Sequence, residues 1–76
     1  MKITLKTYAS LRQYTNGEIT HELELPLGSR IADLLERIQI PTDEIKNIMV
    51  NGKRAKHDGV LRDGDRVALF PPIAGG

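Results

Sequence analysis

The sequence predicts an α+β fold in which one main helix packs across a small mixed β-sheet. Apolar and polar residues alternate over 2–8 and again over 19–25, a period of two that is typical of half-buried strands. A single apolar stripe at helical spacing follows, formed by Ile31, Leu34, Leu35 and Ile38. Further strand-like runs come after it and end at 66–70. Strands flanking one amphipathic helix predict a β-grasp architecture, with the first and last strands side by side at the centre of the sheet.

The first two strands are expected to form an antiparallel hairpin with an extended connection. Ile3, Leu5 and Thr7 share one face of the first strand, and residues 9–14 lose the alternation and predict a short helical turn. Asn16-Gly17 is a turn signal. On the second strand, one face is predicted to carry Ile19, His21, Leu23 and Leu25.

The helix has recognisable start and stop signals. Ser29 is the expected N-cap, because its hydroxyl can accept a hydrogen bond from an unpaired amide of the first turn. Pro41 is expected to stop the helix, since proline lacks the amide donor. Residues 42–45 could start one further short turn.

The second half of the chain is expected to complete the sheet. A third strand is predicted at 47–50, and Asn51-Gly52 is the strongest tight-hairpin signal in the sequence. The fourth strand, at 53–55, is short and basic, as an exposed edge should be. Asp58-Gly59 and 63–65 predict turns, between which Val60 and Leu61 are expected to enter the core.

Composition excludes several classes of function. The chain has 76 residues, 39% of them apolar, so we expect one domain with a modest core and little room for a substrate cleft. An enzyme that works alone is therefore not expected. The net charge of +1 gives no indication of a nucleic-acid or membrane partner, and no apolar run approaches the roughly 20 residues that span a bilayer. With no cysteine either, we expect a soluble cytoplasmic protein.

The last six residues look like a functional tail. We divide the chain into a folded domain at 1–70 and an extended, flexible tail at 71–76, which ends in Gly75-Gly76. Two prolines end the last strand and favour an extended start, and six extended residues reach roughly 20 Å. The small final side chains would let the tail enter a partner's active site and present the carboxylate of Gly76.

Three segments of the chain carry a family resemblance: RDGDRVALFPPIAGG at 62–76, which is the specific one, VNGK at 50–53 and ASLR at 9–12. With them the chain resembles the MoaD/ThiS family of ubiquitin-like sulfur carriers, and most closely the small subunit of molybdopterin synthase. Phe-Pro-Pro before the diglycine is more typical of the molybdopterin branch than of the thiazole-forming branch. The stretch 40–50 is shorter than in typical molybdopterin synthase subunits, which leaves room for a homologue serving a tungsten cofactor or another sulfur pathway.

The resemblance implies a mechanism centred on Gly76. An ATP-dependent, MoeB/ThiF-like activating enzyme would adenylate its carboxylate, and a cysteine desulfurase or rhodanese would supply the sulfur of a thiocarboxylate. That sulfur would be delivered inside a MoaE-like large subunit, with no cofactor bound to the carrier itself. The tail residues expected to thread into the partner are Pro71, Pro72, Ile73, Ala74 and Gly75. The alternatives are a thiamine-thiazole sulfur carrier, a ubiquitin-like modifier conjugated to lysines, and a pure binding module.

Other polar residues give weaker indications. Phe70 is a candidate docking anchor if Leu69 points into the core, because consecutive strand residues face opposite sides. The basic patch of Lys53, Arg54 and Lys56 is either a solvated edge or a docking surface. His21 is expected to pack partly buried, and His57 to lie in a polar loop. The turn aspartates are Asp58, Asp63 and Asp65, whose spacing predicts no metal site.

Overall fold

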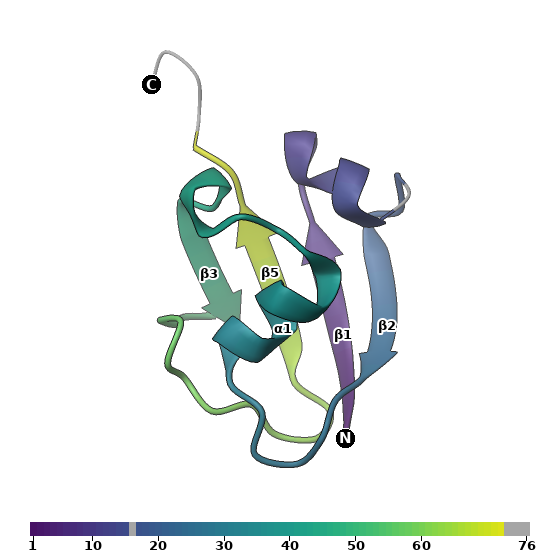
Figure 1. The fold of residues 1–76 in the computed structure, drawn as a ribbon, viewed down its shortest axis with the longest axis vertical. Helices are drawn as coiled ribbons and strands as arrows, with labels where there is room; N and C mark the ends of the chain where they lie inside the picture. The colour runs from purple at the N-terminus through teal and green to yellow at the C-terminus, as the bar shows by residue number, and fades with distance from the viewer. Residues whose placement is uncertain (16, 73–76) are drawn as a thin grey trace.

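The computed structural model describes residues 1–15 and 17–72 and confirms the predicted α+β fold (Figure 1). The elements are β1 (Lys2–Thr7), η1 (Ala9–Thr15), β2 (Thr20–Glu24), α1 (Ile31–Ile38), η2 (Thr42–Glu44), β3 (Asn47–Val50), β4 (Lys53–Arg54) and β5 (Arg66–Phe70). The sheet order is β2-β1-β5-β3-β4. β1 and β5 lie side by side at the centre, as predicted. The structure shows that they pair in parallel, while the other neighbours are antiparallel.

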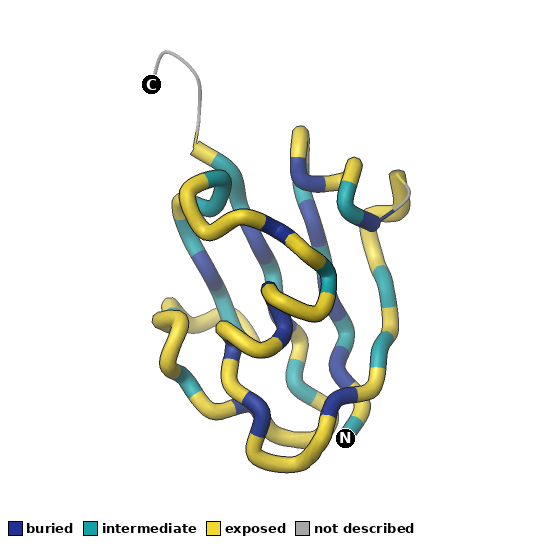
Figure 2. The backbone as a smooth tube through the Cα atoms, in the orientation of Figure 1, coloured by how far each residue is buried: buried dark blue, intermediate teal, exposed yellow. Residues whose placement is uncertain are grey.

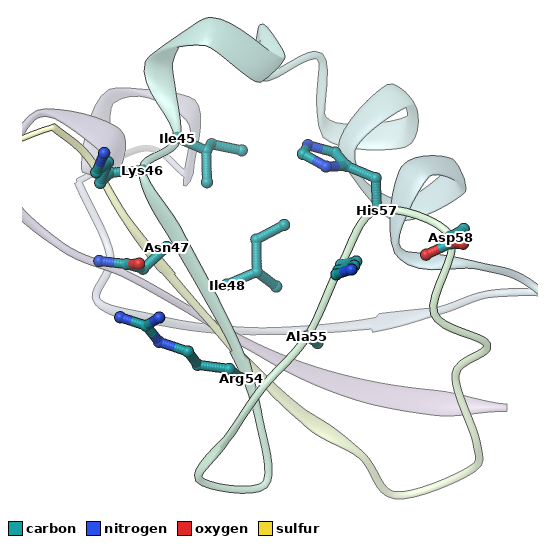
Figure 3. Close-up of a pocket in the computed structure, with 9 residues that line it drawn as sticks. Ile45, Lys46, Asn47, Ile48, Arg54, Ala55, His57 and Asp58 are labelled. Atoms are coloured by element: carbon teal, nitrogen blue, oxygen red, sulfur yellow. The ribbon is translucent and has the colours of Figure 1, made fainter.

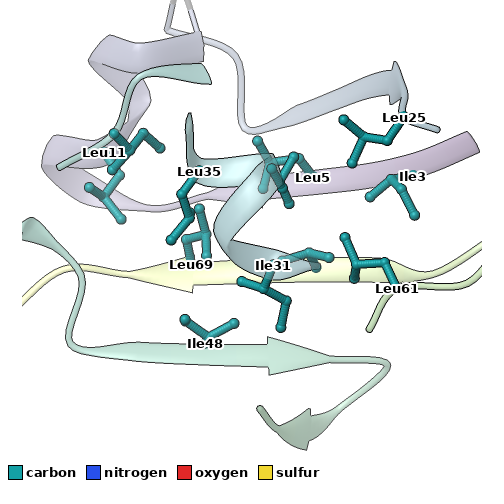
Figure 4. Close-up of a cluster of buried hydrophobic side chains, with 12 residues drawn as sticks. Ile3, Leu5, Leu11, Leu25, Ile31, Leu35, Ile48, Leu61 and Leu69 are labelled. Atoms are coloured by element: carbon teal, nitrogen blue, oxygen red, sulfur yellow. The ribbon is translucent and has the colours of Figure 1, made fainter. Parts of the chain in front are cut away.

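One face of the sheet is closed by α1. In β1 the residues Ile3, Leu5 and Thr7 alternate as buried positions with half-buried ones, and in β5 Val67 and Leu69 do the same. The buried positions of α1 and of the central strands face one another (Figure 2), and their side chains meet between helix and sheet (Figure 4). The buried hydrophobic core consists of Ile3, Leu5, Leu11, Leu25, Ile31, Leu34, Leu35, Ile40, Ile48, Leu61, Val67 and Leu69.

Both ends of α1 differ from the sequence prediction. The N-cap is Arg30, whose backbone amide donates to Asp33 Oδ2 at 2.8 Å, whereas the Ser29 hydroxyl turns back and donates to the Pro26 carbonyl at 2.7 Å. At the other end the helix stops at Gln39, which adopts the left-handed conformation with φ of 59°, two residues before Pro41. The backbone therefore ends the helix by a left-handed cap and not by the proline.

Two residues expected in the core are exposed. Val60 is 56% exposed, because an isolated bridge between Arg30 and Val60 turns this side chain outward while Leu61 enters the core. Ile19 is 47% exposed, because β2 begins only at Thr20. His21 is half-buried as predicted, and Leu23 packs against the core. Asn16 of the predicted first turn lies outside the described residues.

A buried pair of hydroxyls fixes the segment that follows β1. Thr7 Oγ1 and Thr15 Oγ1 lie 2.9 Å apart, and Thr15 Oγ1 also donates to the Glu18 carbonyl at 2.7 Å. Because the hydroxyls are bonded, their burial leaves no polar group without a partner. The pair ties the end of η1 to the end of β1, which holds the intervening Tyr8 next to the sheet.

Candidate functional site

The face of the sheet that α1 leaves uncovered forms the candidate site, and we call it the open face. The registers place Lys6 beside Ala68, Ala68 beside Met49, and Met49 beside Arg54. These residues occupy alternate strand positions to the buried ones, so their side chains point away from the core. The open face comprises Lys6, Tyr8, Met49, Arg54, Arg66, Ala68 and Phe70.

An aromatic pair lies at the end of the open face from which the tail departs. The rings of Tyr8 and Phe70 are stacked, with centroids 4.7 Å apart and planes inclined by 6°. Leu69 is completely buried, so the predicted alternation is confirmed, but Phe70 is half-buried because Tyr8 covers it. Such a pair adds rigidity as well as apolar area to a surface. Sequence reasoning missed Tyr8; its position next to Phe70 follows from the parallel register that pairs Thr7 with Leu69.

The start of the tail is fixed by the same residues. The Lys46 amide donates to the Phe70 carbonyl at 2.7 Å, and this bond closes the last rung of β5. Pro71 follows half-buried and Pro72 exposed. A hollow of about 280 Å³ lies here, lined by Tyr8, Ala9, Lys46, Asn47, Phe70 and Pro71. Ile73, Ala74, Gly75 and Gly76 lie outside the described residues, so their predicted threading into a partner and the reactive role of Gly76 stay predictions.

Cations border the apolar centre of the open face. Arg54 and Arg66 are exposed, and Lys6 is half-buried. The carboxylates Glu22 and Glu24 belong to β2, at the far edge of the sheet. Of the two basic residues predicted to dock a partner, Arg54 shares the open face with Met49, whereas Lys53 pairs with Val50 and projects to the other side. The open face therefore offers an apolar centre with a positive border.

The remaining sequence candidates have structural explanations. Asp63 Oδ1 accepts from the Lys2 amide at 2.7 Å, and Asp65 Oδ2 accepts from the Arg62 amide at 2.8 Å, as expected of turn aspartates. His21 Nδ1 lies 3.7 Å from Glu18 Oε2, while His57 is exposed in its loop. Within residues 1–15 and 17–72, no three metal-ligating side chains gather. No helix in the same ranges is long and apolar enough to cross a membrane.

Comparison with known proteins assigns the family. The ThiS family model matches residues 5–76, and the chain belongs to this family. A curated relative, small archaeal modifier protein 3 from Haloferax volcanii, is 35% identical over 66 residues, which cover 82% of this chain and 70% of the relative. The family consists of small ubiquitin-like sulfur carriers and modifiers, so the β-grasp fold and the family prediction are both confirmed.

Solved structures agree with this assignment. A Pyrococcus furiosus protein designated molybdopterin converting factor subunit 1 is 35% identical, with a TM-score of 0.79 over 96% of this chain and 99% of that chain. The complex of subunits 1 and 2 of the molybdopterin-converting factor from Helicobacter pylori contains a chain of the same fold. That chain is 18% identical, with a TM-score of 0.66 and complete coverage of both chains.

Proposed function

We propose that this chain is the sulfur-carrying small subunit of a molybdopterin-type synthase and works through the carboxylate of Gly76. One observation carries the proposal. Gly75 and Gly76 lie five and six residues beyond Phe70, the last residue of a strand, which is stacked on Tyr8 and anchored at the border of the open face. Family membership supports a carrier or modifier. The 35% identity to the Pyrococcus furiosus converting-factor subunit favours the molybdopterin branch, with molybdenum or tungsten as the final metal.

The chemistry converts an unreactive carboxylate into a sulfur donor. One carboxylate oxygen of Gly76 attacks the α-phosphorus of ATP on an activating enzyme, and pyrophosphate leaves. A persulfide of the donor protein then attacks the acyl carbon and AMP departs, which leaves an acyl disulfide. A second thiolate of the donor cleaves the sulfur–sulfur bond, releases the thiocarboxylate and forms a disulfide on the donor. The sulfur of the thiocarboxylate attacks an acceptor carbon inside the large subunit and displaces an oxygen leaving group. Water then cleaves the resulting thioester at the acyl carbon, so that the sulfur stays on the product and the carboxylate of Gly76 returns. The carrier contributes positioning, since a docked body and a thin tail bring the reacting atoms together.

The open face is the docking surface in this proposal. Tyr8 and Phe70 supply a preformed aromatic anchor, and Ala68 and Met49 extend the apolar contact behind it. Arg54 and Arg66 would pair with carboxylates of the activating enzyme or the large subunit. Because Pro71 and Pro72 cannot extend β5, the chain must leave the sheet beside this anchor. ATP and reduced sulfur are both cytoplasmic resources, so we propose the cytoplasm as the location.

The test is the intact mass of the protein after incubation with an activating enzyme, ATP and a sulfur source. Replacement of one oxygen of Gly76 by sulfur adds about 16 Da. The matched control is the chain lacking Gly76, which should fold and show no gain. If the full chain gains no mass with an enzyme that has activated another carrier in the same assay, the proposal is wrong.

A second candidate function, protein modification, is favoured by the equal identity to small archaeal modifier protein 3. In that case an amine of a target lysine attacks activated Gly76 and forms an isopeptide. Digestion of cell extracts and a search for lysines linked to Gly76 would detect it. A thiazole-forming role predicts the same thiocarboxylate, so assays with the two purified synthases would separate the sulfur pathways.

A further inference from the structure

A groove runs along the outer edge of β3 and shares Arg54, but no other lining residue, with the open face. β4 pairs only with Met49 and Val50, and the chain turns away from β3 after Ala55 donates to the Ile48 carbonyl at 2.9 Å. The first half of the outer edge of β3 therefore borders a hollow of about 520 Å³ instead of another strand (Figure 3). The Lys46 amide and the Ile48 carbonyl are already bonded, to the Phe70 carbonyl and the Ala55 amide, so an extended segment in this hollow would be held by its side chains.

The two sides of the groove differ in chemistry. Ile45 and Ile48 project toward His57, so an apolar wall lies on the side of β3 that faces the core (Figure 3). Lys46 and Arg54 project to the opposite side of the strand, and both are exposed. Lys56 adds a further exposed cation to the lining, against the single carboxylate of Asp58.

We infer that this β3-edge groove binds an extended segment of a partner protein in which acidic and aliphatic residues alternate. In an extended chain, successive side chains point to opposite sides, which matches the two sides of β3. Aliphatic side chains would pack between Ile48 and His57, and carboxylates would meet Lys46 and Arg54. The charge of the lining selects an acidic segment over a basic one. The inference does not depend on the chemistry of Gly76.

The groove also adjoins the start of the tail. Lys46 and Asn47 line both the groove and the hollow beside Pro71. A partner segment in the groove would therefore lie next to the point where the tail leaves the domain.

The test uses the ¹⁵N-labelled full chain and three capped eight-residue peptides. The first alternates glutamate and leucine, the second lysine and leucine, and the third glutamate and serine. The glutamate–leucine peptide should shift the amides of Ile45, Ile48 and Ala55 to saturation, with affinity that falls as salt is added. The other two should bind at least about fivefold more weakly, because each lacks one of the two contacts.

Variants and competing ligands make the inference falsifiable. Lys56→Glu should weaken binding about fivefold, whereas Arg12→Glu, the same charge reversal on η1, should not. The inference would be overturned if the glutamate–serine peptide bound as tightly as the glutamate–leucine peptide, or if inorganic phosphate alone gave saturable shifts. Either result would show a general anion site. Shifts confined to Ala68 and Phe70 would instead place the peptide on the open face. Shifts that grow with protein concentration in the absence of peptide would instead show that a second copy of this chain occupies the groove.

Discussion

The two faces of the central sheet come from the same strands but differ in how deeply their side chains are buried. On the covered face, Leu5, Val67 and Leu69 are fully buried beneath α1. One residue away along the same strands, Lys6, Ala68 and Phe70 are only partly buried. Because side chains alternate along a strand, one residue packs in the core and the next belongs to the proposed docking surface. Substitutions on one face should therefore affect folding, and substitutions on the other should affect partner binding.

The largest expected effect comes from a change in the tail, outside both faces of the sheet. Deleting Gly76 should abolish formation of the thiocarboxylate, because the reactive carboxylate would then belong to Gly75. The melting temperature should change little, because the core of the described residues 1–15 and 17–72 includes neither Pro71 nor Pro72. A bulky substitution, Gly75→Val, should also block activation while leaving folding intact. Intact mass and thermal unfolding measure the two properties, and activity in the deletion variant would contradict the carrier mechanism.

On the covered face, Leu69→Ala should cost about 2–5 kcal/mol of unfolding free energy, because it leaves a cavity beneath the helix. Urea unfolding measures the loss. Partner affinity per folded molecule should change little, since Leu69 does not reach the open face. A comparable loss of affinity in the folded fraction would show that the two faces are not separable.

On the open face, a substitution should weaken partner binding more than it lowers stability. Phe70→Ala should weaken binding to the activating enzyme about tenfold or more, as expected for an aromatic anchor. Its cost in stability should be about 1–2 kcal/mol, from lost apolar area and the lost stack on Tyr8. Phe70→Leu is the matched control, since it keeps apolar area without the ring. Titration calorimetry and urea unfolding on the same samples compare the two effects.

The β3–β4 turn should show a smaller effect. Asn51 has φ of 53°, its Nδ2 donates to Asp65 Oδ1 at 2.9 Å, and its Oδ1 accepts from the Arg66 amide at 2.9 Å. Asn51→Gly keeps the left-handed backbone but removes both bonds, which should cost about 1–2 kcal/mol. Asn51→Ala should cost more, because alanine also strains at positive φ. Equal stability of wild type and Asn51→Gly in urea would show that the bonds contribute nothing.

The smallest expected effect depends on pH. The Tyr14 hydroxyl donates to Glu44 Oε2, and this hydrogen bond, with partial burial and the negative charges of Glu44 and Asp43, raises the pKa of Tyr14 above 10.0. Because the pKa is raised in the folded state, the bond stabilises the protein fully below the unfolded pKa of 10.0, and this contribution is lost as the pH rises through the higher folded-state pKa. Wild type should thus exceed Tyr14→Phe slightly in stability at pH 7. The difference should vanish or reverse at higher pH, and unfolding at pH 7 and 11 measures it.

Sequence periodicity predicted most of the fold but little of the site's detail. The alternation in β1 and β5 placed Leu5 and Leu69 in the core correctly, because a period of two is a local property of the chain. The helix ends were predicted wrongly at Ser29 and Pro41. The N-cap is Arg30, whose amide donates to Asp33, and the helix stops at Gln39 in the left-handed conformation. Val60 was misplaced because a bridge to Arg30, thirty positions earlier, decides which way it turns.

The sequence by itself determined that strands flank one amphipathic helix, that Leu69 and Phe70 face opposite ways, and that the chain carries two prolines and a diglycine after its last strand. Only the tertiary structure decided that Tyr8 stacks on Phe70, that Lys53 and Arg54 face different sides, and that the edge of β3 opens into a groove. The physical reason is the distance along the chain between the residues that decide each feature. Periodicity follows from the geometry of neighbouring residues, whereas these contacts depend on the register between strands that are far apart in the chain.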